Sequence, residues 1–230
     1  MPSTPSVPST RNVPPGQRLR DQALRLIEAA RAEPGGTVPI VQAGHPVLRG
    51  IARPYDGELT PDELTALLRA MRLTMLAAPG VGLAAPQIGL SWALAVVHDP
   101  GTPDPEVTAA REREPLEHRV LVNPRYEAVG DERVSFYEGC LSVVGYQAVV
   151  PRARVVRLTG QDQTGRALDE LVTGWQARIV QHETDHLAGT LYIDRAHIRS
   201  LSATDELGAY WGAQPHPEAA ARALGFPLGS

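Results

Sequence analysis

The amino-acid sequence predicts an α+β fold, with short, mostly antiparallel sheets packed around a central helix. Three segments, 17–33, 60–80 and 173–189, carry apolar residues at the spacing of a helix. Between the second and the third, short runs rich in β-branched and aromatic residues follow one another. Runs of strands that do not alternate with helices favour α+β over a wound parallel sheet.

The first two helices have recognisable boundaries. The segment 17–33 has its apolar residues on one face, as in an amphipathic helix. The second helix is expected to begin at Pro61, because Thr60 is a good N-cap and Glu63 completes a capping box. Pro79, with the glycine after it, is expected to end this helix.

The middle of the chain is expected to be mainly β-structure. Strands are expected over 92–98, 119–129, 133–139 and 153–162. Residues 99–118 are too polar and too rich in proline for a core element, so they are expected to form a surface loop. In the third helix Thr173 is the expected N-cap and Gly189 the expected end, and a short terminal helix is expected over 215–225.

Length and charge narrow the function classes. The chain of 230 residues suits one domain, and residues 1–16, rich in Pro and Ser, are expected to be a disordered tail before a single domain over 17–230. A net charge of −4 leaves no basic patch for DNA or an anionic membrane. No apolar run approaches the roughly 18 residues that span a bilayer. Neither DNA nor a membrane is therefore an expected partner.

The composition adds two hints. All 22 basic residues are arginine, which excludes Schiff-base chemistry on lysine and is typical of GC-rich bacterial coding sequences. The single cysteine, Cys140, cannot form an intramolecular disulfide, and the N-terminus has no secretory signal. We therefore expect a cytoplasmic protein.

The segment "HETDH" (182–186) predicts a metal site. His182 and His186 are four residues apart and lie on one face of a helix, and Glu183 can reach a water near the same ion. The histidines continue the apolar stripe of Trp175 and Ile179, so they are expected to face inward. Catalytic sites of this kind use a third protein ligand.

Sequence spacing alone leaves the third ligand open. Tyr192 stands where metzincin proteases have their third histidine. Glu206 lies at the distance at which thermolysin-like proteases supply a glutamate. Cys140, in "YEGCLSV", offers a thiolate, the strongest of these ligands, although a lone cysteine is usually a small buried apolar residue.

Three stretches together resemble the signature motifs of peptide deformylases, in the right order. They are "GVGLAAPQ" (80–87), "EGCLS" (138–142) and "HETDH" (182–186). The resemblance covers roughly residues 38–196 and leaves 197–230 as a C-terminal extension. The segment "GWQARI" (174–179), just before the third motif, resembles the corresponding segment of the type 1 subgroup, which includes plant and animal organellar enzymes.

The resemblance implies the chemistry. Cys140, His182 and His186 would bind one divalent metal ion, expected to be Fe2+, which Zn2+, Ni2+ or Co2+ can replace. The substrates would be N-formylmethionyl nascent peptides, near the ribosome, from which the formyl group is hydrolysed. Glu183 would be the general base, while the Gln87 amide and the Leu141 backbone N–H would hold the oxyanion.

The surroundings of this site are also expected from the motifs. Val81, Trp175 and Ile179 are expected to line the pocket for the methionine side chain, with plain core packing as the alternative for each. Gly82 is expected to let a substrate strand approach the backbone. Glu138 is expected to order a ligand, with a surface-strand glutamate as the alternative. Asp185 is expected to face solvent, with a carboxylate that orders a ligand as the alternative.

Two other functions compete with the deformylase hypothesis. One is a metalloprotease that uses Glu206 as its third ligand. The other is a metal site without catalysis, although structural zinc sites usually have four protein ligands and only three convincing ones are present.

Overall fold

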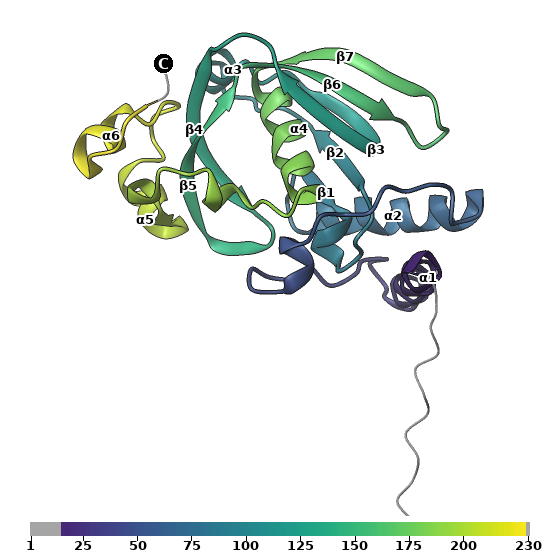
Figure 1. Cartoon of the computed structure of the whole chain (residues 1–230). Coiled ribbons are helices and arrows are strands. Elements are labelled where there is room, and N and C mark those ends of the chain that lie inside the picture. The colour runs from purple at the N-terminus through teal and green to yellow at the C-terminus, as the bar shows by residue number, and fades with distance from the viewer. Residues whose placement is uncertain (1–14, 229–230) are drawn as a thin grey trace, which may run out of the picture.

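The structure is a computed structural model that describes residues 15–228. One helix, α4 (Gly174–Leu187), runs through the middle of the molecule, with a sheet on either side of it (Figure 1). The expected tail, 1–16, lies outside the described residues except for its last two positions. These belong to α1 (Pro15–Ala32), which therefore begins two residues earlier than expected.

The two sheets are antiparallel throughout. The larger has the strand order β1-β2-β3-β6-β7 and the smaller the order β4-β5-β8. The larger sheet comprises β1 (Gly82–Ala84), β2 (Leu94–Asp99), β3 (Leu116–Ala128), β6 (Val155–Gln161) and β7 (Ala167–Thr173). The smaller comprises β4 (Arg133–Cys140), β5 (Val143–Ala153) and β8 (Ser202–Ala203). This arrangement confirms the α+β prediction.

The larger sheet is covered on both faces because its central strands are apolar on both sides. Leu94 and Val96 of β2 pack in one core with α1 and α2 (Pro61–Ala77). The alternate residues Ala95 and Val97 point to the opposite face and pack in a second core with α4. Helix α2 begins with the expected capping box of Thr60 and Glu63.

Residues 99–118 are not the loop that the sequence analysis expects. They contain helix α3 (Pro105–Arg111), and β3 already begins at Leu116. The Asp104 side chain accepts hydrogen bonds from the backbone N–H groups of Glu106 and Val107, and Pro105 takes the first helical position. These start signals stand within a polar, proline-rich run, so composition alone conceals the helix.

Neither β5 nor β7 is among the strands expected from the sequence. The β7 segment "ALDELVT" is rich in residues that strands disfavour, and it lies at the exposed edge of the larger sheet. The β5 segment contains Gly145 and Pro151, which read as turn signals. Both strands form because their partners β6 and β4 supply the hydrogen bonds.

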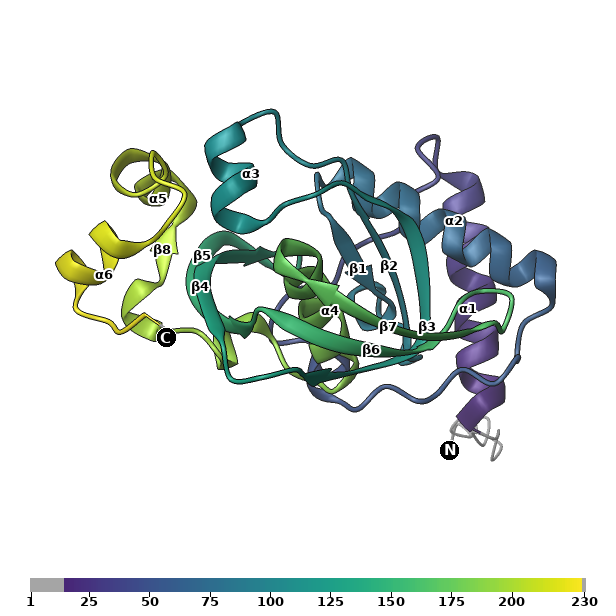
Figure 2. The same ribbon diagram turned by 90° about the horizontal axis from the view of Figure 1, so that it is seen from above.

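The C-terminal extension adds two short helices, α5 (Thr204–Tyr210) and α6 (Glu218–Leu224). The expected helix over 215–225 is therefore present but shorter. Both helices lie beside the smaller sheet, on the side of the molecule opposite α1 and α2 (Figure 2). Four 3-10 turns complete the elements, at Pro46–Arg49, Ala85–Ile88, Tyr192–Asp194 and Ile198–Ser200. Among residues 15–228, no helix has the length and apolar character needed to cross a membrane.

Candidate metal centre and substrate cavity

Helix α4 holds the two histidines of the "HETDH" motif on one face. The rings of His182 and His186 lie edge to face, with centroids 5.1 Å apart. Gly189 ends the helical segment with a φ of 74°, and a side chain there would meet the Arg49 carbonyl oxygen at 2.7 Å. The expected end of the helix is confirmed. Glycine is needed at this position because the backbone is left-handed and because a Cβ would clash with the Arg49 carbonyl.

Cys140, the last residue of β4, completes the cluster. Its Sγ lies 3.3 Å from His186 Nε2, and the candidate ligand atoms of Cys140, His182 and His186 all lie within 4.8 Å of one another. One sulfur and two imidazole nitrogens form a donor set suited to a divalent transition metal, so the residues fit the ion that the sequence analysis expects. Glu206, the alternative ligand, is exposed on α5 and does not belong to this cluster.

A buried carboxylate orients His182. Glu138 Oε2 lies 2.9 Å from His182 Nδ1, which leaves the other ring nitrogen to face the cluster. Burial opposes the ionisation of Glu138, but Arg152 and Arg178 outweigh it and hold its pKa well below the usual value. The surface-strand alternative for Glu138 is wrong, because the residue is 6% exposed.

Asp185 does not face solvent as the sequence analysis expects. It is 3% exposed and accepts hydrogen bonds from Arg152 Nη1 at 2.6 Å and from the Tyr126 hydroxyl at 2.9 Å. Arg195 adds an ion pair at 2.7 Å. A carboxylate in this position links α4 to β5 and β3, and the pairing with two arginines explains why it can be buried.

Glu183 follows His182 directly and, unlike Glu138 and Asp185, forms no ion pair with an arginine among the described residues. It is 4% exposed, its Oε2 has no hydrogen-bond partner within the described chain, and burial raises its pKa to about 7. Gly82 makes room for it, because a Cβ at that position would lie 2.2 Å from Glu183 Oε1. From the sequence, Gly82 was expected only to let a substrate strand approach the backbone. Its contact with Glu183 becomes visible only in the fold.

The side-chain amide of Gln87 points its N–H group toward Cys140. Its Oε1 accepts a hydrogen bond from the Ala84 backbone N–H at 2.8 Å, which fixes the orientation of the amide. Its Nε2 then lies 3.5 Å from Cys140 Sγ and 3.4 Å from Ser142 Oγ. Leu141 follows Cys140 directly, and both line the same cavity.

That cavity has a volume of about 840 Å³, and Gln87, Glu138, Cys140, His182 and Glu183 line it. The residues expected at the substrate, namely Val81, Gly82, Trp175 and Ile179, all line it. The cavity has further lining residues that were not expected from the sequence. They are Arg111 of α3 and Leu207, Trp211 and His216 of the C-terminal extension. The large apolar side chains of the extension, Trp211 among them, were the available signal.

The fold and this site are those of a metal-dependent hydrolase with an H-E-x-x-H helix. A family model of polypeptide deformylases matches residues 37–201. Peptide deformylase 3 of Streptomyces avermitilis is 56% identical over 97% of this chain and 96% of its own length. The mitochondrial peptide deformylase of Homo sapiens is 37% identical over 75% of this chain and 71% of its own length.

The solved structures agree. A crystal structure of a class I type b peptide deformylase from Acinetobacter baumannii with bound Met-Ala-Ser matches with a TM-score of 0.61 and 35% identity. The match covers 69% of this chain and 99% of that one. The chain belongs to the peptide deformylase family, whose members are hydrolases that remove N-terminal formyl groups.

Proposed function

We propose that the chain hydrolyses the formyl group of N-formylmethionyl peptides, with Cys140, His182 and His186 holding the metal ion and Glu183 moving the proton. The observation that carries this proposal is a cluster of three metal-binding side chains, two of which, Cys140 and His182, line the same cavity as the unpaired buried carboxylate of Glu183. Family membership supports the reaction class.

The metal ion supplies Lewis-acid chemistry when bound, polarising the formyl carbonyl and making water more acidic. The thiolate and two imidazoles would hold it. We propose ferrous iron as the native ion, because a thiolate donates charge and ferrous iron expands its coordination more readily than zinc. Zn2+, Ni2+ or Co2+ would occupy the same ligands.

Glu183 accepts the proton of the attacking water and later delivers it to the leaving amine of methionine. A base for this step needs a pKa near the working pH, and burial raises the pKa of Glu183 to about 7. The contact with Gly82 and the rigid helix on either side hold the carboxylate in place.

Gln87 and Leu141 stabilise the oxyanion that forms on the formyl oxygen. Neutral N–H donors that are already aimed at developing charge cost no reorganisation during the reaction. The bond from Ala84 to Gln87 Oε1 provides this aim, because it turns the amide nitrogen toward the cluster. The Leu141 backbone N–H is the second donor.

Val81, Trp175 and Ile179 bind the methionine side chain, and Gly82 lets the peptide lie along β1. An edge strand is a natural docking site for an extended peptide. Peptide binding by the relative that holds Met-Ala-Ser supports this assignment. We place the reaction on nascent chains near the ribosome in the cytoplasm, because a cysteine ligand needs a reducing compartment.

The test is hydrolysis of formyl-Met-Ala-Ser, with acetyl-Met-Ala-Ser as the control substrate. Release of a free N-terminal amine from the formylated peptide but not from the acetylated one supports the proposal, and equal rates would contradict it. Metal content of the Cys140→Ser, His182→Ala and Glu206→Ala variants tests the ligands. We expect the metal to be lost in the first two and retained in the third, whereas loss in the Glu206 variant alone would favour the protease alternative.

The identity of the ion is tested separately. The protein is stripped of metal and reloaded without oxygen with iron, nickel or zinc. We expect the iron and nickel forms to turn over much faster than the zinc form, and the iron form to lose activity in air, with Cys140 as a site of oxidation. Equal rates for iron and zinc would contradict the assignment of iron.

A further inference from the structure

The outer part of the cavity contains an arginine without an acidic partner. Arg111, the last residue of α3, lines the cavity with its guanidinium carbon 4.8 Å from the Trp175 ring centroid and 5.7 Å from that of Phe136. Its Nε is buried and has no hydrogen-bond partner among residues 15–228. Packing against two aromatic rings holds the side chain but does not neutralise its charge.

The other two arginines at Trp175 are neutralised. Arg113 donates two hydrogen bonds to Asp99, at 2.8 and 2.9 Å. Arg178 pairs with Glu138 at 2.5 Å. Of the three cations around this ring, Arg111 is therefore the one that the described chain leaves without a carboxylate.

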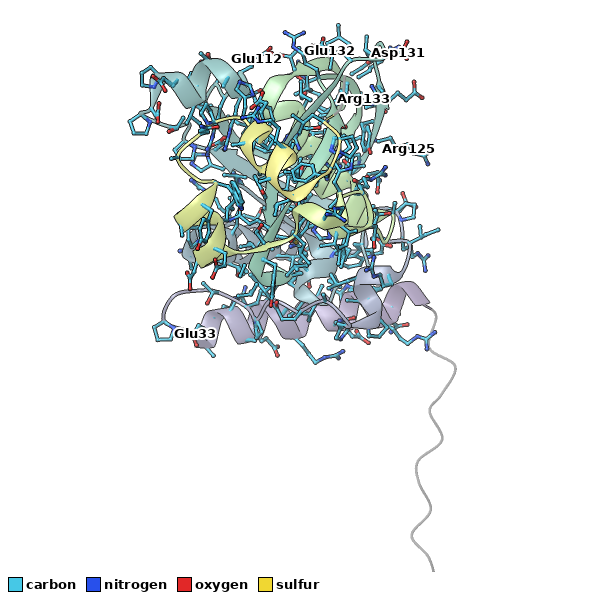
Figure 3. The ribbon with its side chains drawn as sticks, turned by 90° about the vertical axis from the view of Figure 1, so that its left-hand side faces the viewer. Glu33, Glu112, Arg125, Asp131, Glu132 and Arg133 are labelled. Carbon is cyan, nitrogen blue, oxygen red and sulfur yellow. The ribbon has the colours of Figure 1, made fainter. Side chains whose placement is uncertain are left out.

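The carboxylate next in sequence is also engaged elsewhere. Glu112 accepts a hydrogen bond from Arg154 Nε at 2.7 Å, and in Figure 3 it lies at the same end of the molecule as Glu132, the second partner of Arg154. Burial, followed by the charge of Arg113, lowers the pKa of Arg111. Both effects disfavour the cation, so a ligand with a negative charge would relieve them.

The charge of Arg111 lies in the cavity where the reaction is proposed to take place. Arg111 lines the same cavity as Cys140 and Glu183, and Trp175, on which it stacks, stands on the helix that carries the two histidines. His216 of the C-terminal extension stacks on Phe136 at 5.4 Å and also lines the cavity, so the arginine is enclosed from a second side.

We propose that Arg111 binds a carboxylate of the formylated peptide, beyond its methionine, and so makes the enzyme favour acidic peptides. This inference rests on the proposed function. The anionic groups of a peptide are Asp and Glu side chains and the terminal carboxylate, and a planar guanidinium binds a carboxylate through two parallel N–H bonds. In a partly desolvated cavity such a pair is stronger than on an open surface.

The experiment measures kcat/KM for formyl-Met tetrapeptide amides. Asp is placed in turn at the second, third and fourth positions, and each peptide is compared with its Asn counterpart. A further pair compares a free C-terminal carboxylate with the amide. We expect a preference of about tenfold for the charged member of at least one pair, the size of a hydrogen bond to a charged group.

Three variants identify the source of the preference. Arg111→Gln should reduce it to near one, and Arg111→Lys should keep part of it. Arg125→Gln is the matched control, because Arg125 is exposed on β3 and projects from the edge of the molecule in Figure 3. It removes the same charge and should leave the preference as in the unaltered protein. Far-ultraviolet circular dichroism and melting temperature check that each variant is folded.

The outcomes separate this inference from the proposed function. A preference in an Asp–Asn pair identifies a side chain of the nascent peptide, and a preference only for the free terminus identifies the terminal carboxylate. Equal rates for charged and neutral peptides would overturn the inference while leaving the deformylase function intact. An unchanged preference in a folded Arg111→Gln variant would also overturn it. Failure to hydrolyse any formylated peptide would contradict the proposed function itself.

Discussion

The two ends of the cavity are held in place by different kinds of interaction. At the inner end, Glu138 and Asp185 are buried and paired with arginines, and they brace the helix that carries the histidines. At the outer end, Trp211 and His216 lie in the turns between α5 and α6 and make aromatic and apolar contacts. Directional ion pairs hold the inner end, whereas the outer end relies on contacts without strong direction.

This difference predicts which end of the cavity should tolerate amino-acid substitutions. A buried charge needs its partner, because removing one member leaves the other unpaired at a cost of about 3–5 kcal/mol. An aromatic side chain at a cavity wall can be shortened with the loss of only its own contact. Substitutions at the inner end should therefore affect catalysis or folding strongly, and those at the outer end should affect mainly substrate affinity.

The largest effect should come from Glu183→Gln. The amide has nearly the shape of the carboxylate but cannot accept the proton of water, so kcat should fall by about 10²–10⁴-fold. Metal content and melting temperature should stay close to those of the unaltered protein, since Glu183 has no ion-pair partner. Substantial turnover with metal bound would show that another group is the base.

Gly82→Ala should show that the close approach of β1 to Glu183 matters. A Cβ would lie 2.2 Å from Glu183 Oε1, so the carboxylate must move. A displacement of about 1 Å at a catalytic group costs on the order of 10²-fold in rate. Gly208→Ala is the control, because a Cβ at Gly208 meets nothing within 4 Å. Similar rates for both variants would mean that the contact is unimportant.

Glu138→Gln should weaken metal binding. The substitution removes the charge that orients His182 and balances Arg152 and Arg178. We expect metal affinity to fall by about 10–100-fold, together with a lower melting temperature. Competition with a chelator measures the affinity. An unchanged affinity in a folded variant would limit Glu138 to a structural role, and Glu132→Gln, at an exposed position, is the control.

Trp211→Ala should give the smallest effect and test the outer end. Trp211 lines the cavity, so loss of its ring should raise KM by about fivefold, equivalent to roughly 1 kcal/mol of apolar contact, with little change in kcat. Tyr210→Ala is the matched control, because Tyr210 is 67% exposed and does not line this cavity. A fall in kcat as large as that expected of Gly82→Ala would contradict the contrast between the two ends.

The unexpected features of the site arise from long-range pairing. The sequence favours a solvent-facing Asp185 over one that orders a ligand. It is buried because Tyr126 and Arg152, from β3 and β5, reach it. Helix α3 and strands β5 and β7 were missed for a related reason, because their local composition is typical of loops and only their capping or pairing partners stabilise them.

By itself the sequence determined the fold class, the helix that carries His182 and His186, and the motif that contains Cys140. These are local properties, since apolar periodicity, capping residues and motif spacing act within a few turns of chain. Tertiary structure alone decided which charges are paired. Arg113 and Arg178 meet carboxylates and Arg111 does not, although the three residues look alike in the sequence. Burial and charge balance depend on segments that meet only after folding. The unpaired charge in the outer part of the cavity could therefore not be predicted from the sequence.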